Sequence, residues 1–158
     1  MQILRTTLAA LLLISFGLTA SAQNTQSLLA AYYGVKDALV ATDAAKAKAK
    51  AGVLVAAVGK VDVSKLSPAD KNALAAVKTS AGHIGMGTDI EHQREQFEVL
   101  SKNMIALTKS TKPGKAYVQY CPMAAEGKGA SWLSSQKQIA NPYYGSKMMT
   151  CGKVTEEI

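Results

Sequence analysis

The sequence predicts an all-α protein: an up-down bundle of about four helices, followed by an irregular C-terminal segment rich in cysteine, methionine and aromatic residues. Residues 24–110 are rich in Ala, Leu, Val and Lys and repeat apolar residues at helical spacings. Residues 111–158 hold three of the four prolines, both cysteines and the only tryptophan, a composition typical of turns. The predicted helices are joined by short connections, which favour antiparallel neighbours.

The start of the chain is typical of a cleavable signal peptide, residues 1–22. One positive charge, Arg5, precedes an apolar stretch, and Ala20 and Ala22 are the small residues that signal peptidase reads before its cleavage site. The stretch is shorter than the roughly 20 residues of a membrane-spanning helix. We therefore expect a single mature domain, residues 23–158, that is periplasmic or secreted and has no membrane anchor after signal cleavage.

The first two helices are predicted from apolar spacing and from a cap. The first, over about 26–40, places five apolar residues on one face: Leu28, Leu29, Tyr32, Val35 and Leu39. The second begins after Thr42 or Asp43, either of which is a good N-cap, and continues to about Val61. Its first turns are alanine and lysine and are expected to be solvated, whereas its last turns are apolar.

The third and fourth helices have clear starts. Ser67 caps the third helix, with Pro68 at its first position and Asp70 at its third, and glycines end it after His83. The fourth begins at Thr88, because Glu91 three residues later completes a capping box. Its apolar stripe consists of Ile90, Phe97, Leu100, Met104 and Leu107.

The C-terminal segment, residues 111–158, has little helical periodicity. Residues 116–120 alternate in polarity and predict one short strand that leads into Cys121. Trp132, Tyr143 and Tyr144 are expected to be packing anchors, and Asn141 with the proline after it predicts a turn.

Composition argues against several classes of function. The net charge of +7 comes with few arginines and few aromatic residues, so a solvated lysine face is favoured over nucleic-acid binding. The chain lacks the hydrolase and phosphate-binding motifs, and its cysteines are not arranged as Cys-x-x-Cys. We therefore expect a protein that is not an enzyme.

Sulfur is the notable chemistry of this chain. Cys121 and Met123 form one pair, and Met148 and Met149 with Cys151 form a second group in mirrored order. Thiolates and thioethers are soft ligands that select copper(I) and similar ions, and a histidine nitrogen suits copper as well. The two histidines are His83 and His92, and for His92 a solvated helix face is the favoured interpretation.

A disulfide is the alternative to a metal site. Two cysteines in an oxidising compartment usually pair, and a Cys121–Cys151 bridge would contribute roughly 3 kcal/mol to stability. The methionines would then fill a small core. The residues alone leave both interpretations open, and a redox-switched pair would serve as a bridge in one state and as ligands in the other.

Several segments together resemble a bacterial exported family of domains of unknown function. They are Tyr120-Cys121-Pro122-Met123-Ala124, Trp132-Leu133-Ser134, Asn141-Pro142-Tyr143-Tyr144-Gly145, Met148 and Cys151-Gly152, with further matches at His83-Ile84 and in the fourth helix. The family occurs as stand-alone proteins and fused to periplasmic adaptor subunits of copper/silver efflux pumps. The resemblance covers nearly the whole mature chain and implies a helical domain that handles heavy metals.

The resemblance implies a set of metal ligands by position: His83, Cys121, Met123, Met148 and Cys151. Beside these, Met149 is an alternate for Met148, and His92, one turn before Gln96 on the same helix face, would replace a family histidine that this chain lacks, or else the site is weaker or altered. The family often has a histidine where this chain has Gln96, a poor ligand for soft metals.

We therefore expect a periplasmic protein that binds copper(I) or a similar soft ion and acts in metal handling or efflux, with an efflux adaptor or another envelope protein as partner. The alternative is a disulfide-stapled structural or interaction module of the cell envelope that holds no metal.

Overall fold

The computed structural model describes residues 24–158, so the predicted signal peptide, residues 1–22, lies outside the described residues. A first helix spans residues 24–40. The remaining elements follow in this order: α2 (Ala44–Val58), the short helix η1 (Val63–Lys65), α3 (Pro68–Met86), α4 (Ile90–Thr111), β1 (Tyr117–Cys121), β2 (Ala130–Ser134), the short helix η2 (Gly145–Lys147) and β3 (Lys153–Glu157).

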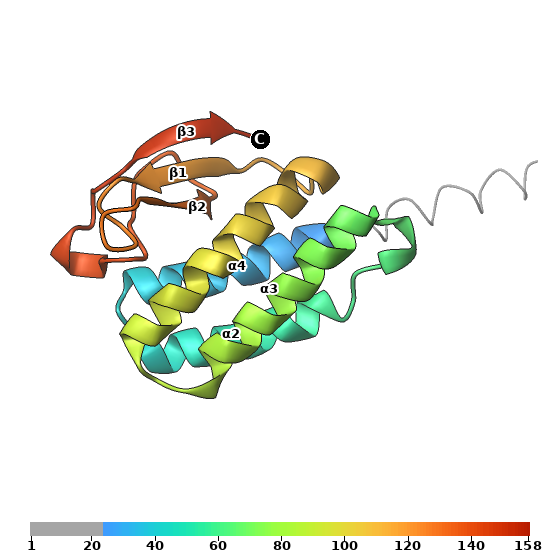
Figure 1. The fold of residues 1–158 in the computed structure, drawn as a ribbon, viewed down its shortest axis with the longest axis horizontal. Helices are drawn as coiled ribbons and strands as arrows, with labels where there is room; N and C mark the ends of the chain where they lie inside the picture. Colours follow the sequence, from blue (N-terminus) through green and yellow to red (C-terminus); the bar gives the residue numbers. More distant parts are fainter. Residues whose placement is uncertain (1–23) are drawn as a thin grey trace, which may run out of the picture.

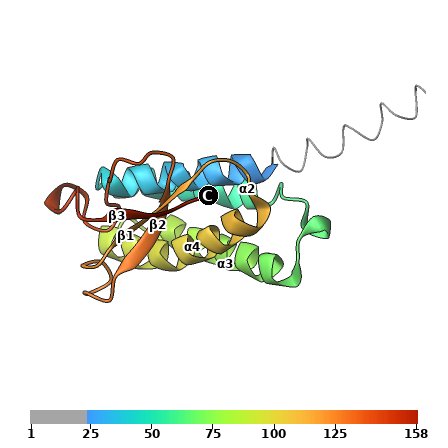
Figure 2. The ribbon, with the colours of Figure 1, turned by 90° about the horizontal axis from the view of Figure 1, so that it is seen from above.

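The four long helices pack side by side as a bundle, and the strands lie along one side of it (Figure 1). α3 packs against both α2 and α4, and α4 also contacts β2. The view from above shows the first helix, in blue, and α4 close to the strands (Figure 2). The predicted four-helix bundle is therefore confirmed. No helix among residues 24–158 is both long enough and apolar enough to cross a bilayer.

The prediction of an all-α fold is wrong, because the C-terminal segment contains a three-stranded antiparallel sheet in the order β2-β1-β3. The predicted strand at 116–120 is confirmed as β1, one residue further along the chain. β3 pairs with the other edge of β1 with a register shift at Val118 and Gln119, and all five of its residues are exposed. Because β3 has no buried face, its sequence lacks the alternation that reveals a half-buried strand.

The N-caps predicted for α2 and α3 are confirmed, and the one predicted for α4 is wrong by one residue. Asp43 caps α2 by accepting a hydrogen bond from the Lys46 backbone N–H, and Ser67 caps α3 in the same way from Asp70. α4 begins one residue later than predicted, because Asp89 rather than Thr88 is its cap. The Asp89 carboxylate accepts from two backbone N–H groups of the first turn, whereas a hydroxyl usually accepts from one.

A column of four aromatic rings joins the bundle to the sheet, and we call it the aromatic column. The ring of Tyr32 in the first helix stacks on Phe97 of α4 with centroids 5.3 Å apart. Phe97 contacts Tyr143 at 5.7 Å, and Tyr143 contacts Trp132 of β2 at 5.9 Å. Because all four rings are nearly or fully buried, the helices and the sheet share one hydrophobic core. The predicted packing role of Trp132 and Tyr143 is thereby confirmed.

Two hydroxyl groups of the aromatic column hold the outer edge of β2. The Tyr32 hydroxyl accepts from the Leu133 backbone N–H at 3.1 Å and also hydrogen-bonds the Ser101 hydroxyl at 2.7 Å. The Tyr143 hydroxyl donates to the Ser131 carbonyl at 2.9 Å. The backbone groups on this edge of the sheet are therefore hydrogen-bonded within the molecule. Burial of the Tyr32 side chain raises the pKa of its hydroxyl well above the usual value.

Replacing Tyr32 with Phe is expected to lower the free energy of unfolding by about 1–3 kcal/mol, because the buried Leu133 N–H then lacks an acceptor. The adjacent Tyr33 is the matched control. Its hydroxyl is buried without a hydrogen-bond partner among the described residues, and burial raises its pKa to about 12. Tyr33→Phe is therefore expected to be neutral or mildly stabilising. Urea unfolding of both variants checks this, and equal losses would contradict it.

The Asp70 carboxylate is expected to make stability depend on pH. Hydrogen bonds from the Ser67 and Ser110 hydroxyls, at 2.7 and 2.8 Å, lower the pKa of Asp70 below its usual value. Because the pKa of Asp70 is lower in the folded protein, the carboxylate contributes to the free energy of unfolding at pH values above the unfolded pKa of about 3.9. This contribution is lost as the pH falls through the folded-state pKa. The stability gap between the wild type and Asp70→Ala should therefore be constant near neutrality and shrink below about pH 4. Urea titrations from pH 7 to pH 2.5 measure it, and a gap that widens in acid would contradict the assignment.

Candidate functional site

Two cysteines form a disulfide at one end of the sheet, and a methionine lies within three residues of each along the chain; we call Cys121, Met123, Met148 and Cys151 the sulfur cluster. Cys121 ends β1, and Cys151 lies in the turn that leads into β3. The two cysteines form a disulfide with their Cα atoms 5.6 Å apart. Met123 follows two residues after Cys121, and the Met148 carbonyl accepts a hydrogen bond from the Cys151 backbone N–H at 3.1 Å. The structure thus places both predicted sulfur groups on one pair of adjoining turns.

The loop at 141–145 ties the two halves of the sulfur cluster together. The fully buried Asn141 donates from its backbone N–H to the Met149 carbonyl at 3.0 Å and from its side chain to the Cys151 carbonyl at 2.9 Å. The Tyr144 hydroxyl donates to the Met123 carbonyl on the other half. The two turns are therefore held in place by hydrogen bonds as well as by the disulfide.

The same loop is anchored to the helical bundle by Arg94 of α4. Arg94 is 5% exposed and donates from Nε to the Pro142 carbonyl at 3.1 Å and from a terminal nitrogen to the Thr42 hydroxyl at 3.2 Å. Gly145 has a φ of 56°, and a Cβ there would lie 2.3 Å from the Thr42 hydroxyl. Only glycine fits this close approach, so the loop has little freedom to move away from the bundle.

Solvent reaches the thioethers more easily than the cysteines. Met123 is 53% exposed and Met148 is 37% exposed, whereas Cys121 is fully buried and Cys151 is half-buried. Large apolar side chains usually lie inside, so two exposed methionines beside one disulfide invite an explanation beyond packing. The further candidate Met149 is half-buried, and its carbonyl is used by Asn141.

The two histidines are not brought to the sulfur cluster by any hydrogen bond or ion pair of the described residues. His83 lies in the last turn of α3, and α3 is packed on the side of α4 away from the strands (Figure 1). His92 lies in the first turn of α4, exposed, with its Nδ1 3.9 Å from a carboxylate oxygen of Glu95. Within residues 24–158, no group of three or more His, Cys, Asp or Glu side chains is placed to hold a metal ion. Any metal bound by the sulfur cluster would therefore need the methionines as donors.

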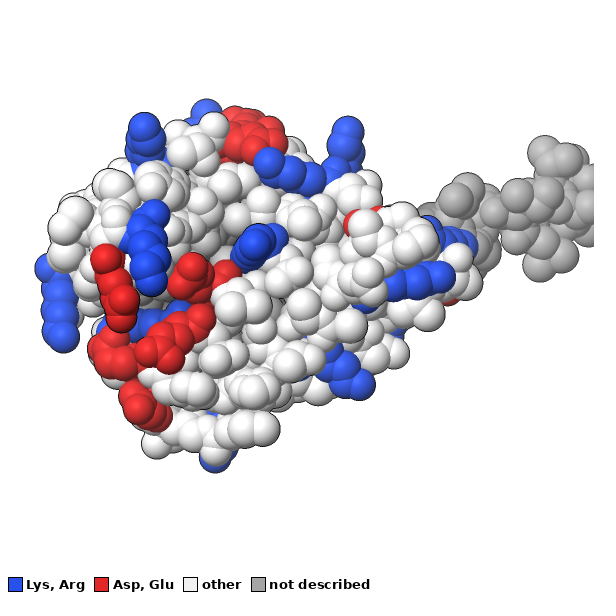
Figure 3. Space-filling view, viewed as in Figure 1, with Lys and Arg blue, Asp and Glu red and all other residues white. Residues whose placement is uncertain are grey.

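An acidic pocket adjoins the sulfur cluster. Four glutamates, Glu91, Glu95, Glu98 and Glu126, line a pocket of about 270 Å³ together with Arg94 and with Tyr144, whose hydroxyl bonds the Met123 carbonyl. Glu91 pairs with Arg94 at 3.0 Å and Glu126 with Lys128 at 3.7 Å, so the pocket keeps an excess of carboxylates but not four free ones. Figure 3 shows acidic side chains gathered at the left of this face. The chain as a whole carries a net charge of +7, so this surface differs in sign from the protein around it. A negative surface raises the local concentration of cations.

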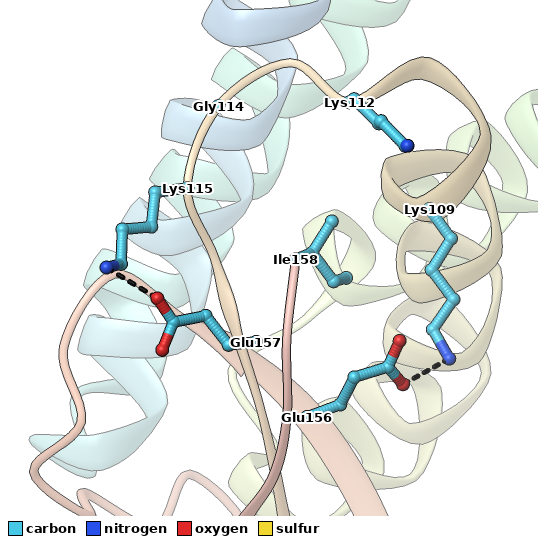
Figure 4. Close-up of a pocket in the computed structure, with 7 residues that line it drawn as sticks. All are labelled: Lys109, Lys112, Gly114, Lys115, Glu156, Glu157 and Ile158. Atoms are coloured by element: carbon cyan, nitrogen blue, oxygen red, sulfur yellow. Dashed lines mark ion pairs between the residues drawn. The ribbon is translucent and has the colours of Figure 1, made fainter.

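A larger pocket, of about 640 Å³, lies at the opposite end of β1 and has a different character. Figure 4 shows Lys109 paired with Glu156 and Lys115 paired with Glu157, each at 2.5 Å, across the end of β3. The ion pair lowers the pKa of Glu157 and raises that of Lys115, so both groups are held charged. Neither Lys115 nor Glu157 is therefore poised to exchange a proton near neutral pH.

Sequence reasoning identified the sulfur residues and missed the residues that position them. The turn at Asn141 was expected, but its hydrogen bonds to the Met149 and Cys151 carbonyls were not, because they join segments up to ten residues apart. The sequence did not indicate that Arg94 anchors this loop, because a charged residue on an amphipathic helix is ordinarily expected to face solvent.

The comparisons with known proteins identify a family for the helical part of the chain. The family model described as "Protein of unknown function (DUF3347)" matches residues 28–116. No curated protein and no solved structure matches the chain. The matched segment covers most of the first helix and all of α2, α3 and α4, and it stops before β1, so it contains none of the four residues of the sulfur cluster.

Replacing Asn141 with Ala is expected to lower the free energy of unfolding by about 2–3 kcal/mol, because the buried Tyr143 N–H and the Cys151 carbonyl both lose their partner. Asn103→Ala is the matched control. The Asn103 side chain bonds only the Val99 carbonyl of its own helix, so its loss should change stability by less than about 0.5 kcal/mol. Denaturant unfolding of the two variants measures the difference. A loss at Asn141 no larger than that at Asn103 would show that Asn141 does not secure the cluster.

Proposed function

We propose that this chain, which belongs to the DUF3347 family, is a periplasmic, non-enzymatic protein that binds copper(I) or a similar soft ion through its sulfur cluster and passes it on in metal handling or efflux. The observation that carries the proposal is the pairing of two cysteines with two exposed methionines on hydrogen-bonded turns. Soft sulfur ligands of this kind favour copper(I) over the hard cations.

The disulfide makes the proposed site dependent on redox state. In the bonded form the two cysteine sulfurs are not thiolates, and Met123 and Met148 are the remaining soft donors. A dithiol reductant breaks the S–S bond, supplies two electrons and two protons, and is itself oxidised to a disulfide. The two thiols formed then lose their protons as the metal binds, because thiolate is the ligating form.

The surroundings of the sulfur cluster support this role. The loop at 141–145 holds the backbone of both turns, so only side chains have to be ordered when a metal binds, and an ordered backbone lowers the entropy lost on binding. The adjacent acidic pocket would draw cations toward the exposed thioethers. Exposure of Met123 and Met148 leaves room for a partner protein, such as an efflux adaptor, to take the ion by ligand exchange.

Titration of copper(I) against a competing chelator, under anaerobic conditions, tests the proposal. Protein reduced with a dithiol and then freed of it should show two free thiols and hold one copper(I). Met123→Leu and Met148→Leu should each weaken the binding by about tenfold, which corresponds to about 1.4 kcal/mol. The untreated, disulfide-bonded protein should bind far more weakly.

Met86→Leu is the control for this titration. Met86 is 74% exposed, more than either methionine of the cluster, but it ends α3 and lies outside the cluster. Its substitution should leave copper affinity unchanged. Equal losses for Met86 and Met148 variants, or equal affinity of the reduced and oxidised proteins, would contradict the assignment of the site.

A disulfide-stapled interaction module without a metal is the second candidate, and the Cys121–Cys151 bond with its buried Cys121 favours it. It predicts that reduction lowers stability by roughly 3 kcal/mol, as for a closed loop of this length, and that the reduced protein retains no copper. The copper titration therefore separates the two candidates.

A further inference from the structure

A second feature, independent of the sulfur cluster, lies between the first helix and α2. A groove of about 610 Å³ runs along the two helices, and we call it the helical groove. Ala30 and Ala31 line it from the first helix, and Lys50, Val53 and Ala56 line it from α2, with Lys60 two residues beyond the end of that helix. The lining residues run from Asn24 to Gly34 and from Lys50 to Lys60, which at a helical rise is about 15 Å or nearly three turns.

The middle of the helical groove is apolar and open to solvent, and Asn24 and Ser27 line the end where the first helix begins. Val53 is 55% exposed, and Ala30 and Ala56 are exposed as well. α2 already buries Ala51 and Leu54 inside the bundle, so it presents apolar residues on two faces. A helix that packs against the bundle on one side needs only one apolar face, so the second is available for another element.

The charged side chains around the helical groove are lysines that have no acidic partner among the described residues. Lys46, Lys48, Lys50 and Lys60 are the charged residues of the segment 44–61, and none of them forms an ion pair with a described residue. No Asp or Glu lines the groove. The Lys50 side chain lies across Gly34, within 3.3 Å of where a Cβ would stand, so one ammonium group is carried at that end of the groove.

The shape and charge of the helical groove distinguish between three possible occupants: a second copy of the chain, a membrane and a helix of a partner protein. Two copies of this chain packed face to face through the groove would set lysines against lysines, because a two-fold interface repeats the same surface. Membrane insertion needs large apolar side chains that project outward, and Val53 is the only large one here. A concave apolar floor three turns long suits a helix, and the lysines suit carboxylates at its flanks.

We propose that the helical groove binds an amphipathic helix of a partner protein, with small and medium aliphatic side chains on its apolar face and Asp or Glu flanking that face. The partner helix lies along the first helix and α2, and its carboxylates pair with Lys50 and Lys60. Since this surface includes no member of the sulfur cluster, docking and metal binding proceed on separate parts of the molecule.

The test uses two synthetic helical peptides with the same Leu and Ala pattern, one flanked by Glu and the other by Lys. Fluorescence anisotropy with the purified protein measures binding of each peptide, and amide chemical shifts locate it. The Glu peptide should bind and shift residues 24–34 and 50–60, and the Lys peptide should bind at least about tenfold more weakly, since two rim charges change sign.

Variants of the groove make the test specific. Lys50→Glu with Lys60→Glu should reverse the preference between the peptides, and Ala56→Gln should weaken both by obstructing the floor. Lys78→Glu with Lys128→Glu, exposed lysines outside the groove, matches the change in net charge and should leave the preference unchanged. Circular dichroism and urea unfolding confirm that each variant is folded.

Three outcomes would overturn the inference: no binding of the Glu peptide, equal binding of both peptides, or shifts that fall outside the groove. Binding of the purified protein to anionic phospholipid vesicles that depends on Lys50 and Lys60, without binding of the Glu peptide, would assign the surface to a membrane instead. Because the two sites are separate, the groove variants should leave copper(I) affinity unchanged. A negative result in the peptide-binding test can therefore be distinguished from a negative result in the copper titration.

Discussion

The aromatic column is the contact on which the remaining structure depends. A three-stranded sheet of five-residue strands has too small a core to be stable alone, and β3 buries no face of its own. Trp132 and Tyr143 carry the sheet and its loop onto Phe97 and Tyr32 of the bundle. The Tyr32 and Tyr143 hydroxyls then satisfy the outer edge of β2, so the column supplies both apolar burial and hydrogen bonds.

The position of the sulfur cluster follows from this attachment. Tyr143 belongs to the column, and its neighbours Asn141 and Tyr144 hold the turns that carry Cys121, Met123 and Cys151. Arg94 fixes the same loop from α4, about one turn before Phe97 and on the same buried side of that helix. A rigid element thus supports the donors from behind, while the thioethers face solvent. The proposed capture and release of an ion would require such an arrangement.

Much of this structure was accessible from the sequence, for physical reasons that differ between its parts. The helices were predictable because caps such as Ser67 and periodic apolar residues act locally. β2 and β3 were not, because β2 is joined to β1 by an irregular connection over residues 122–129, and β3 pairs with β1 from a distant part of the chain and has no buried face. The pairing of the sulfur groups was expected from Cys121 and Cys151, but the roles of Asn141 and Arg94 rest on long-range hydrogen bonds that leave no sequence pattern.

The central claim is that the sulfur of Cys121, Met123, Met148 and Cys151 acts as one ligand set once the disulfide is reduced. X-ray absorption spectroscopy at the copper K edge, on the reduced protein loaded with one equivalent of copper(I), tests it most directly. The account predicts a first shell of sulfur that loses a scatterer when Met148 is replaced by Leu. A first shell dominated by nitrogen and oxygen, unchanged in that variant, would contradict it.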